Sequence, residues 1–254
     1  MATKTERFVV ISDTHGDNLD PAAFAAARSF IDEFKPVHRI HAGDVFDLRW
    51  LRAKASDTEK KESTVADLQA GYDLIDWFQP TVVLWGNHDA RLQRALEETS
   101  GVVLDAVKSI VNEVADSLPR GCVTYPYDKR KGVHQLADWR IIHGYSHGET
   151  ALRLAAGAYG NVMMGHVHRS ERVKVNGIED RIGLGIGCLC KLDLAYNAAS
   201  LNTLKQSHGF AYGFIVDGRA VVFQAAPTDK GVWILPTEFR TMGASDGQGK
   251  NSGR

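Results

Sequence analysis

The chain has 254 residues, a length that forms one large domain or two small ones and buries a full core without disulfide bonds. Its 44% hydrophobic and 24% charged residues are ordinary for a globular protein and exclude a disordered or fibrous chain. The 30 Lys and Arg residues nearly balance the 31 Asp and Glu residues, so no overall field draws the protein to nucleic acid or to an anionic membrane.

The first third of the chain alternates short apolar runs with amphipathic stretches. Residues 8–11 predict a strand that is buried on both faces. A helix is expected next, with Asp20 as its N-cap and Pro21 in its first turn, and Pro36 ends it. A second strand is predicted around residues 39–41, before a polar turn.

A charged segment separates the second strand from the next helix. Residues 49–62 have almost no apolar periodicity and predict an exposed loop or a cap insertion. The helix that follows is expected to begin with a capping box formed by Thr64 and Asp67, and a third buried strand is predicted at residues 81–85. Two further helices are expected near residues 90–98 and 101–117.

After Pro119 the pattern changes to short strands, which are expected near 122–125, 139–143 and 161–164. Asn176-Gly177 and Asp217-Gly218 each lie between apolar runs and predict two β-hairpins. Strand and helix alternation followed by a meander favours an α/β fold of two packed sheets flanked by helices. We expect one domain over residues 1–245 and a disordered tail over 246–254.

The cysteines and apolar runs indicate the compartment. Cys122, Cys188 and Cys190 lack the spacing of a zinc site and are expected to be buried thiols, the last two in a strand rather than as ligands. The N-terminal apolar stretch is too short for a signal-peptide core, and no run approaches the 18 or more residues of a membrane span. We therefore expect a cytoplasmic protein that does not bind a membrane.

Chemistry-bearing side chains follow five predicted strands, at the point where each strand ends. In open α/β sheets this is where ligands bind, so five segments can converge on one rim. The polar residues at these positions are Asp13, His15, Asp44, Asn87, His88, Asp89, His143, His166 and His168.

Seven of these side chains predict a metal site. Carboxylate and amide oxygens mixed with imidazoles, without a thiolate, suit Mn²⁺, Fe or Zn²⁺. Glycines precede Asp44, Asn87 and His166, and a missing Cβ there lets backbone and side chains crowd around small ions. Seven ligands are too many for one tetrahedral ion, so the pattern predicts two ions.

As a set, these blocks resemble the calcineurin-like metallophosphoesterase superfamily, and the resemblance extends from residue 13 to residue 168. It implies a four-layer α/β/β/α sandwich that hydrolyses phosphate mono- or diesters with a hydroxide shared between two divalent ions, Mn²⁺ being our first expectation. One ion would be held by Asp13, His15, Asp44 and His168. The other would be held by Asp44, Asn87, His143 and His166, so that Asp44 bridges the pair.

The resemblance also implies roles for residues that do not bind metal. His88 is similar to the superfamily's histidine that contacts the phosphate or protonates the leaving oxygen, and Asp47 to the carboxylate that orients it. The protein phosphatases of the superfamily have arginines where this chain has Leu48 and Trp85, which disfavours a Ser/Thr protein phosphatase.

Other side chains are candidates for contact with substrate. Arg91 and Arg49 lie close in sequence to the motifs and could bind phosphate with a forked donor, and His147 lies near enough to touch substrate or to be an exposed loop histidine. Trp85 and the other tryptophans are expected to pack in the core rather than to stack on bases.

We expect a hydrolase that acts on a phosphodiester or nucleotide-type substrate. The alternative is a metal-dependent DNA or RNA nuclease, although the neutral net charge gives a nucleic-acid partner no support. An alternative of another class is a catalytically silent metal-binding scaffold, but such a protein tends to lose ligands or the catalytic histidine, and none is lost here.

Overall fold

The computed structural model describes residues 5–52, 55–57, 59–177, 179–192 and 201–236. The expected tail at 246–254 and the expected domain end at 245 lie outside these residues. Within them, the strands form one six-stranded and one five-stranded sheet.

The first sheet has the order β11-β10-β1-β2-β3-β4. Strands β1 to β4 are parallel, whereas β10 and β11 run antiparallel at the other edge, so the sheet is mixed. The strands are β1 (Thr5–Ile11), β2 (His38–His41), β3 (Val82–Leu84), β4 (Val123–Tyr125), β10 (Phe210–Val216) and β11 (Arg219–Ala225).

The second sheet has the order β5-β6-β7-β9-β8. Strands β6, β7 and β9 are parallel, and β5 and β8 pair antiparallel at the two edges, so this sheet is mixed as well. The strands are β5 (His134–Leu136), β6 (Trp139–Ile142), β7 (Val162–Met164), β8 (Ser170–Val175) and β9 (Arg181–Ile186).

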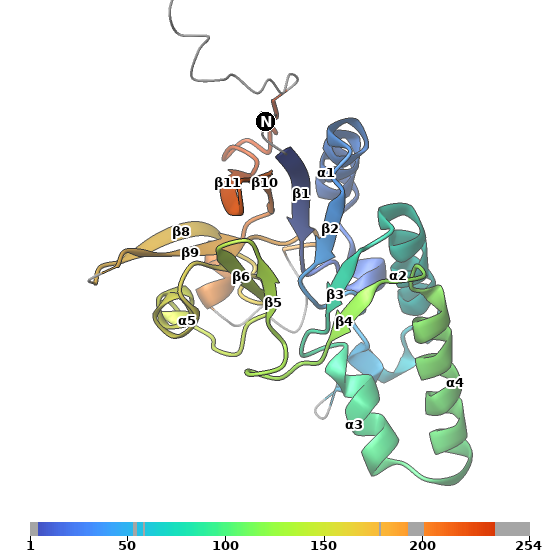
Figure 1. Ribbon diagram of the computed structural model, residues 1–254. Coiled ribbons are helices and arrows are strands. Elements are labelled where there is room, and N and C mark those ends of the chain that lie inside the picture. Colours follow the sequence, from blue (N-terminus) through green and yellow to red (C-terminus); the bar gives the residue numbers. More distant parts are fainter. Residues whose placement is uncertain (1–4, 53–54, 58, 178, 193–200, 237–254) are drawn as a thin grey trace, which may run out of the picture.

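Helices cover the outer faces of the two sheets, and α3 and α4 extend beyond the β3–β4 edge (Figure 1). The helices are α1 (Pro21–Phe34), α2 (Thr64–Phe78), α3 (Ala90–Glu98), α4 (Gly101–Ser117) and α5 (Ala151–Tyr159). Short 3₁₀ turns are η1 (Gly16–Asn18), η2 (Arg49–Leu51), η3 (Glu59–Lys61) and η5 (Leu201–Lys205). The expected fold class, two mixed sheets flanked by helices, is confirmed.

Alternating side chains of β1 show how the layers pack. Phe8 and Val10 point into the core between the two sheets, where they meet residues such as Ile141 of β6. Val9 and Ile11 point to the opposite face and pack against α1. All four are fully buried, and each such side chain contributes about 1.5–3 kcal/mol relative to an exposed one. The continuous apolar run in the sequence therefore follows from burial on both faces.

Local capping agrees with the sequence in one helix and differs in the next. The carboxylate of Asp20 accepts hydrogen bonds from Ala22 N and Ala23 N at the start of α1, as predicted. The N-cap of α2 is Ser63, so the predicted capping box of Thr64 and Asp67 is wrong. The carboxylate of Asp67 is buried and bonds elsewhere, as described below.

The two predicted hairpins both form. Val216 pairs with Arg219 across Asp217-Gly218, and both turn residues have positive φ, 51° and 78°, as a type I′ turn requires. The other hairpin joins β8 to β9 by a longer connection, since Val175 pairs with Arg181.

Some expectations for the second half and for the cysteines are corrected. Strand β5 and helix α5 have no counterpart in the sequence prediction. Cys188 and Cys190 lie beyond the end of β9 and form only isolated bridges, and Cys122 is half-buried rather than buried. The charged segment 49–62 carries the short turns η2 and η3. No helix in the described part of the chain is long and apolar enough to cross a membrane.

Candidate metal centre

The seven candidate ligands lie at the carboxyl ends of parallel strands from both sheets. The first sheet supplies Asp13 and His15 after β1, Asp44 after β2 and Asn87 after β3; the second supplies His143 after β6 and His166 and His168 after β7. Asn87 and His166 are half-buried and the other five are buried. The structure thus brings together side chains that are up to 155 positions apart in the sequence.

One group of donor atoms surrounds a point between β1 and the β7–β8 connection. His15 Nε2 lies 3.2 Å from His168 Nε2, and His168 Nε2 lies 3.2 Å from Asp13 Oδ1. Asp44 Oδ2 is 3.7 Å from His15 Nε2. These are the four residues expected to hold the first ion.

A second group adjoins the first. His143 Nε2 lies 3.3 Å from Asp44 Oδ2 and 3.0 Å from Asn87 Oδ1. Asn87 Oδ1 is also 2.8 Å from Nδ1 of His166. Asp44 Oδ2 therefore belongs to both groups, which is the position that a bridging carboxylate requires.

The donors fit divalent cations. Two imidazole nitrogens that face each other at 3.2 Å need a shared proton or a cation between them. His166 Nε2 is buried and finds no hydrogen-bond partner among the described residues. Burial opposes charge on both members of the Asp44–His143 pair, yet their attraction raises the pKa of His143 to about 9 and holds the pKa of Asp44 well below its ordinary value. The cluster therefore favours positive charge at its centre.

The backbone that carries these ligands is strained. Five of the seven candidate ligands have left-handed φ values between 52° and 66°, namely Asp13, His15, Asp44, His166 and His168. For residues with a Cβ this conformation costs roughly 1–2 kcal/mol each. Such strain is held in place by the surrounding structure and gathers at functional sites.

Glycines make room for the centre, as the sequence predicted. A Cβ on Gly86 would collide with the carboxylate of Asp44 and come within 2.5 Å of its backbone nitrogen. A Cβ on Gly165 would collide with Ser12 and lie 2.7 Å from Asp13 Oδ2. The absence of side chains at these strand ends is therefore a steric requirement of the cluster.

Asp47 connects the cluster to His88. Its Oδ1 lies 2.7 Å from His88 Nδ1 and 3.2 Å from His15 Nδ1. Its Oδ2 accepts hydrogen bonds from Asn18 Nδ2 at 2.8 Å and from Arg49 Nη1 at 3.2 Å. One buried carboxylate thus fixes the orientation of a candidate ligand and of the candidate catalytic histidine.

Two supporting carboxylates were not assigned to the metal centre in the sequence analysis. Asp89 accepts hydrogen bonds from four backbone N–H groups, those of Asp44, Val45, Phe46 and Gly86, and so ties the loop after β2 to the loop after β3. Asp67 reaches from α2 to accept hydrogen bonds from Asp47 N at 2.9 Å and Leu48 N at 2.6 Å. In the sequence, Asp89 belonged to the polar block after the third predicted strand and Asp67 to the predicted capping box, and neither pattern indicated these loop contacts.

The three candidates for substrate contact differ in their surroundings. The buried Arg49 makes ion pairs with Asp17, Asp47 and Glu62. Arg91 is buried too, and its Nη1 donates a hydrogen bond to Asp47 O at 2.7 Å. His147 is exposed, with its ring centroid 4.4 Å from that of His166, so it lies at the mouth of the cluster.

Cys190 is a residue that sequence reasoning set aside. Its Sγ lies 3.6 Å from Nδ1 of His168, whose Nε2 faces the cluster. His15, His168 and Cys190 are close enough together to hold an ion. No sequence motif indicated this contact, because it depends on how the segment beyond β9 packs beneath the β7–β8 connection.

The chain is similar to known proteins both at the level of a sequence family and at the level of solved structures. A family model described as calcineurin-like phosphoesterase matches residues 6–170. No curated protein matches the chain. The solved structures that resemble it include a conserved protein from Streptococcus pneumoniae described as a predicted phosphoesterase, with 16% identity, TM-score 0.39 and coverage of 92% of this chain and 95% of that one.

Two further solved structures have similar values. A metallophosphoesterase from Sphaerobacter thermophilus is 14% identical with a TM-score of 0.44, and the match covers 87% of this chain and 88% of that one. Vacuolar protein sorting 29 from Cryptosporidium parvum is 13% identical with a TM-score of 0.44, and the match covers 89% and 93%.

Proposed function

This chain belongs to the calcineurin-like phosphoesterase family, and from that premise we propose that it is a metal-dependent hydrolase of a phosphodiester or nucleotide-type phosphate ester. The observation that carries the proposal is the sharing of one carboxylate oxygen by two groups of ligands. Asp44 Oδ2 lies 3.3 Å from His143 Nε2 and 3.7 Å from His15 Nε2.

Two divalent cations, Mn²⁺ being the first candidate, would occupy the centre. We assign one to Asp13, His15, Asp44 and His168, and the other to Asp44, Asn87, His143 and His166. When bound, a pair of ions of this kind lowers the pKa of water and neutralises charge on the phosphoryl oxygens.

His88 is assigned to protonate the leaving oxygen. Its Nδ1 lies 2.7 Å from Asp47 Oδ1 and 2.9 Å from Asp47 O, which orients the ring, and we assign Nε2 as the nitrogen that acts on substrate. Asp47 is a positioning residue, and Arg49 forms an ion pair with Oδ2 of that carboxylate, while Oδ1 faces His88. His147 is assigned to contact the bound ester, and Arg91 holds the backbone of Asp47 through the hydrogen bond from its Nη1 to Asp47 O.

The test uses protein freed of metal with a chelator and then loaded with Mn²⁺. We expect hydrolysis of bis(4-nitrophenyl) phosphate that depends on the metal, slower hydrolysis of 4-nitrophenyl phosphate, and no cleavage of single-stranded DNA. Faster cleavage of the DNA would support a nuclease instead. Metal binding without hydrolysis of any of the three would support a silent scaffold and overturn the proposal.

A variant pair separates the metal centre from the rest of the fold. Asp44→Asn keeps the shape of the side chain and removes the shared negative charge, so we expect loss of bound metal and of hydrolysis together. Asp217→Asn, in the turn between β10 and β11, is the matched control and keeps both. Full activity of Asp44→Asn would contradict the assignment of this cluster.

A further inference from the structure

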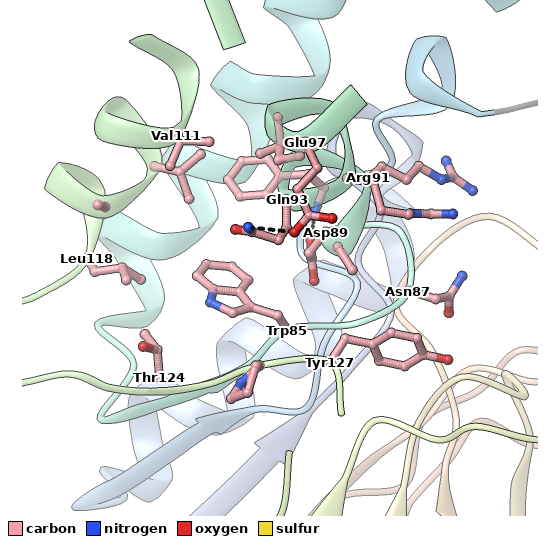
Figure 2. Close-up of a pocket in the computed structure, with 17 residues that line it drawn as sticks. Trp85, Asn87, Asp89, Arg91, Gln93, Glu97, Val111, Leu118, Thr124 and Tyr127 are labelled. Atoms are coloured by element: carbon pink, nitrogen blue, oxygen red, sulfur yellow. Dashed lines mark hydrogen bonds between the residues drawn. The ribbon is translucent and has the colours of Figure 1, made fainter. Parts of the chain in front are cut away.

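A large cavity lies beside the metal centre. It has a volume of about 830 Å³ and is bounded by α3, α4 and the segments that follow β3 and β4 (Figure 2). Cavities of roughly 300–1,000 Å³ are typical of small-molecule sites. Its inner wall is apolar and contains Leu92, Val111, Val114 and Leu118, with the half-buried Trp85 among them.

Two residues of the cavity wall lie next to the metal centre. Asn87 lines the cavity, and its Oδ1 lies 3.0 Å from His143 Nε2. Tyr127 lines it as well, and its ring centroid is 5.8 Å from that of His143. Figure 2 shows Trp85 reaching into the space between α3 and α4 while Tyr127 lies nearer Asn87. A molecule whose phosphate lies at the centre would therefore place its other part against these rings.

Arg94 supplies a cation at the junction. It lines the cavity and is exposed, and within the described part of the chain no hydrogen bond or ion pair involves it. Burial and the charge of Asp44 raise the pKa of Tyr127 to about 12, and the Arg94 cation opposes that rise, so the two side chains are within electrostatic reach. Arg91, the other arginine of the cavity, donates to Asp47 O.

The rim offers polar partners. Gln93, Glu97 and Thr124 line the cavity and are exposed, and Gln93 Nε2 donates a hydrogen bond to Glu97 Oε1 at 3.3 Å. Side chains of this kind can donate to and accept from the ring nitrogens and exocyclic groups of a heterocycle. Flat aromatic walls with a polar rim therefore suit a heteroaromatic ring better than an alkyl chain.

We propose that this cavity binds the heteroaromatic base of a nucleotide-type ester, stacked on Trp85 and Tyr127, while Arg94 contacts a phosphate oxygen. The inference rests on the proposed function for the position of the phosphate. The inference adds the base as the part of the substrate that the protein recognises, and it gives Trp85 a role besides packing.

The first experiment compares two ligands that differ only in the base. Calorimetry measures the binding of adenosine 5′-monophosphate and of ribose 5-phosphate to the Mn²⁺-loaded protein. We expect the nucleotide to bind roughly ten- to hundredfold more tightly, in line with what stacking of a base on aromatic side chains contributes. Equal affinities, or tighter binding of octyl phosphate than of the nucleotide, would overturn the inference.

A variant that blocks the cavity can be paired with a control substitution on the same helix. Ala115 is exposed on α4 and lines the cavity, whereas Ala106 is exposed on the same helix and does not. Ala115→Trp should bring the affinity ratio of the two ligands close to one and leave the affinity for ribose 5-phosphate within about twofold of wild type. Ala106→Trp should keep the wild-type ratio. An unchanged ratio in Ala115→Trp would contradict the inference.

Two variants test the named contacts. Trp85→Phe should keep most of the preference and Trp85→Ala should lose it. Arg94→Gln should weaken both ligands equally, by roughly tenfold, because it removes a charge-assisted hydrogen bond to phosphate. Weakening of the nucleotide alone in Arg94→Gln would contradict the phosphate contact.

A metal-free measurement distinguishes this inference from the proposed function. Adenosine carries no phosphate, so calorimetric binding of adenosine to chelator-treated protein reports the cavity alone. Binding that Ala115→Trp abolishes, in a protein that hydrolyses no ester, would retain the base site and reject the proposed function. Hydrolysis of the ester without any base-dependent binding would retain the proposed function and reject the base site.

Discussion

At the scale of single residues, one buried carboxylate organises the candidate site. Asp47 is fully buried and receives hydrogen bonds from Asn18 and Arg49 while it orients His15 and His88. Burial would raise the pKa of Asp47, but these two histidines hold it well below its ordinary value. The carboxylate therefore stays charged, and the orientation of His88 depends on that charge.

Asp47→Asn tests this dependence. The amide would turn an NH₂ group toward donors such as Asn18 Nδ2 and Arg49 Nη1, or toward the histidines, so His88 would lose its fixed orientation. We expect kcat for bis(4-nitrophenyl) phosphate to fall roughly 100-fold or more at saturating Mn²⁺ with little change in KM. Measurement of bound metal is the control. A variant that keeps wild-type kcat with full metal content would remove Asp47 from the mechanism.

A second prediction at this scale concerns Cys190. Its Sγ lies 3.6 Å from Nδ1 of His168 and helps to set the plane of that ring. Loss of a partner behind a metal-binding histidine typically costs 10- to 100-fold in metal affinity. We expect Cys190→Ala to weaken Mn²⁺ binding, measured by calorimetry, by about that factor. Cys122→Ala is the control because Cys122 is half-buried and packs against an apolar cluster rather than against a candidate ligand. Equal Mn²⁺ affinities in the two variants would be evidence against a role of Cys190 in metal binding.

At the scale of secondary-structure elements, the loops after β2 and β3 are held by Asp89. Its carboxylate satisfies backbone N–H groups from both loops, including those of Asp44 and Gly86, at 2.8 Å each. Without it these buried donors would have to find water or remain unsatisfied. The position of the candidate bridging ligand Asp44 is thus set by a residue that follows it by more than forty positions.

Asp89→Ala should therefore destabilise the protein more than loss of an ordinary helix cap. Each buried donor left without a partner costs about 1–3 kcal/mol, so we expect the free energy of unfolding to fall by about 3 kcal/mol or more. Asp20→Ala, which removes the N-cap of α1, should cost about 1 kcal/mol. Urea denaturation of both variants measures the difference. Equal losses would mean that the two loops are held by other contacts.

At the scale of the whole molecule, the centre exists only where the two sheets meet. Asp13, Asp44 and Asn87 follow strands of the first sheet, whereas His143 and His168 follow strands of the second. A cation that bridges these groups binds the folded state and has no equivalent site in the unfolded chain. Metal binding should therefore stabilise the packing of one sheet on the other.

This coupling predicts a metal-dependent melting temperature. Metal at 100 times its Kd adds about 2.7 kcal/mol to stability, which for a chain of this size raises Tm by roughly 5–10 °C. Thermal unfolding with Mn²⁺ and with a chelator measures the shift. Asp44→Asn should lose most of it, and an equal shift in wild type and variant would place the stabilising metal elsewhere.

The local elements could be predicted because their causes are local. The buried strand at residues 8–11, the Asp20 cap and the Asp217-Gly218 turn each follow from residue type and spacing within a few positions. The capping box at Asp67 was wrong because Ser63 is the N-cap of α2, and the carboxylate of Asp67 bonds to the loop after β2 rather than to its own helix. Helix α5 was missed in a region that otherwise contains short strands.

The sequence by itself determined the set of polar residues at the strand ends, because apolar runs that break abruptly leave a pattern in consecutive residues. The order of these motifs carries the resemblance to the family, and the resemblance implies the fold class. Only the tertiary structure decided how these residues are supported and what lies beside them. The contact of Cys190 with His168, the bonds of Asp89 to two loops and the cavity between α3 and α4 join segments distant in the chain. Such contacts depend on the packing of whole elements, and no local spacing encodes that packing.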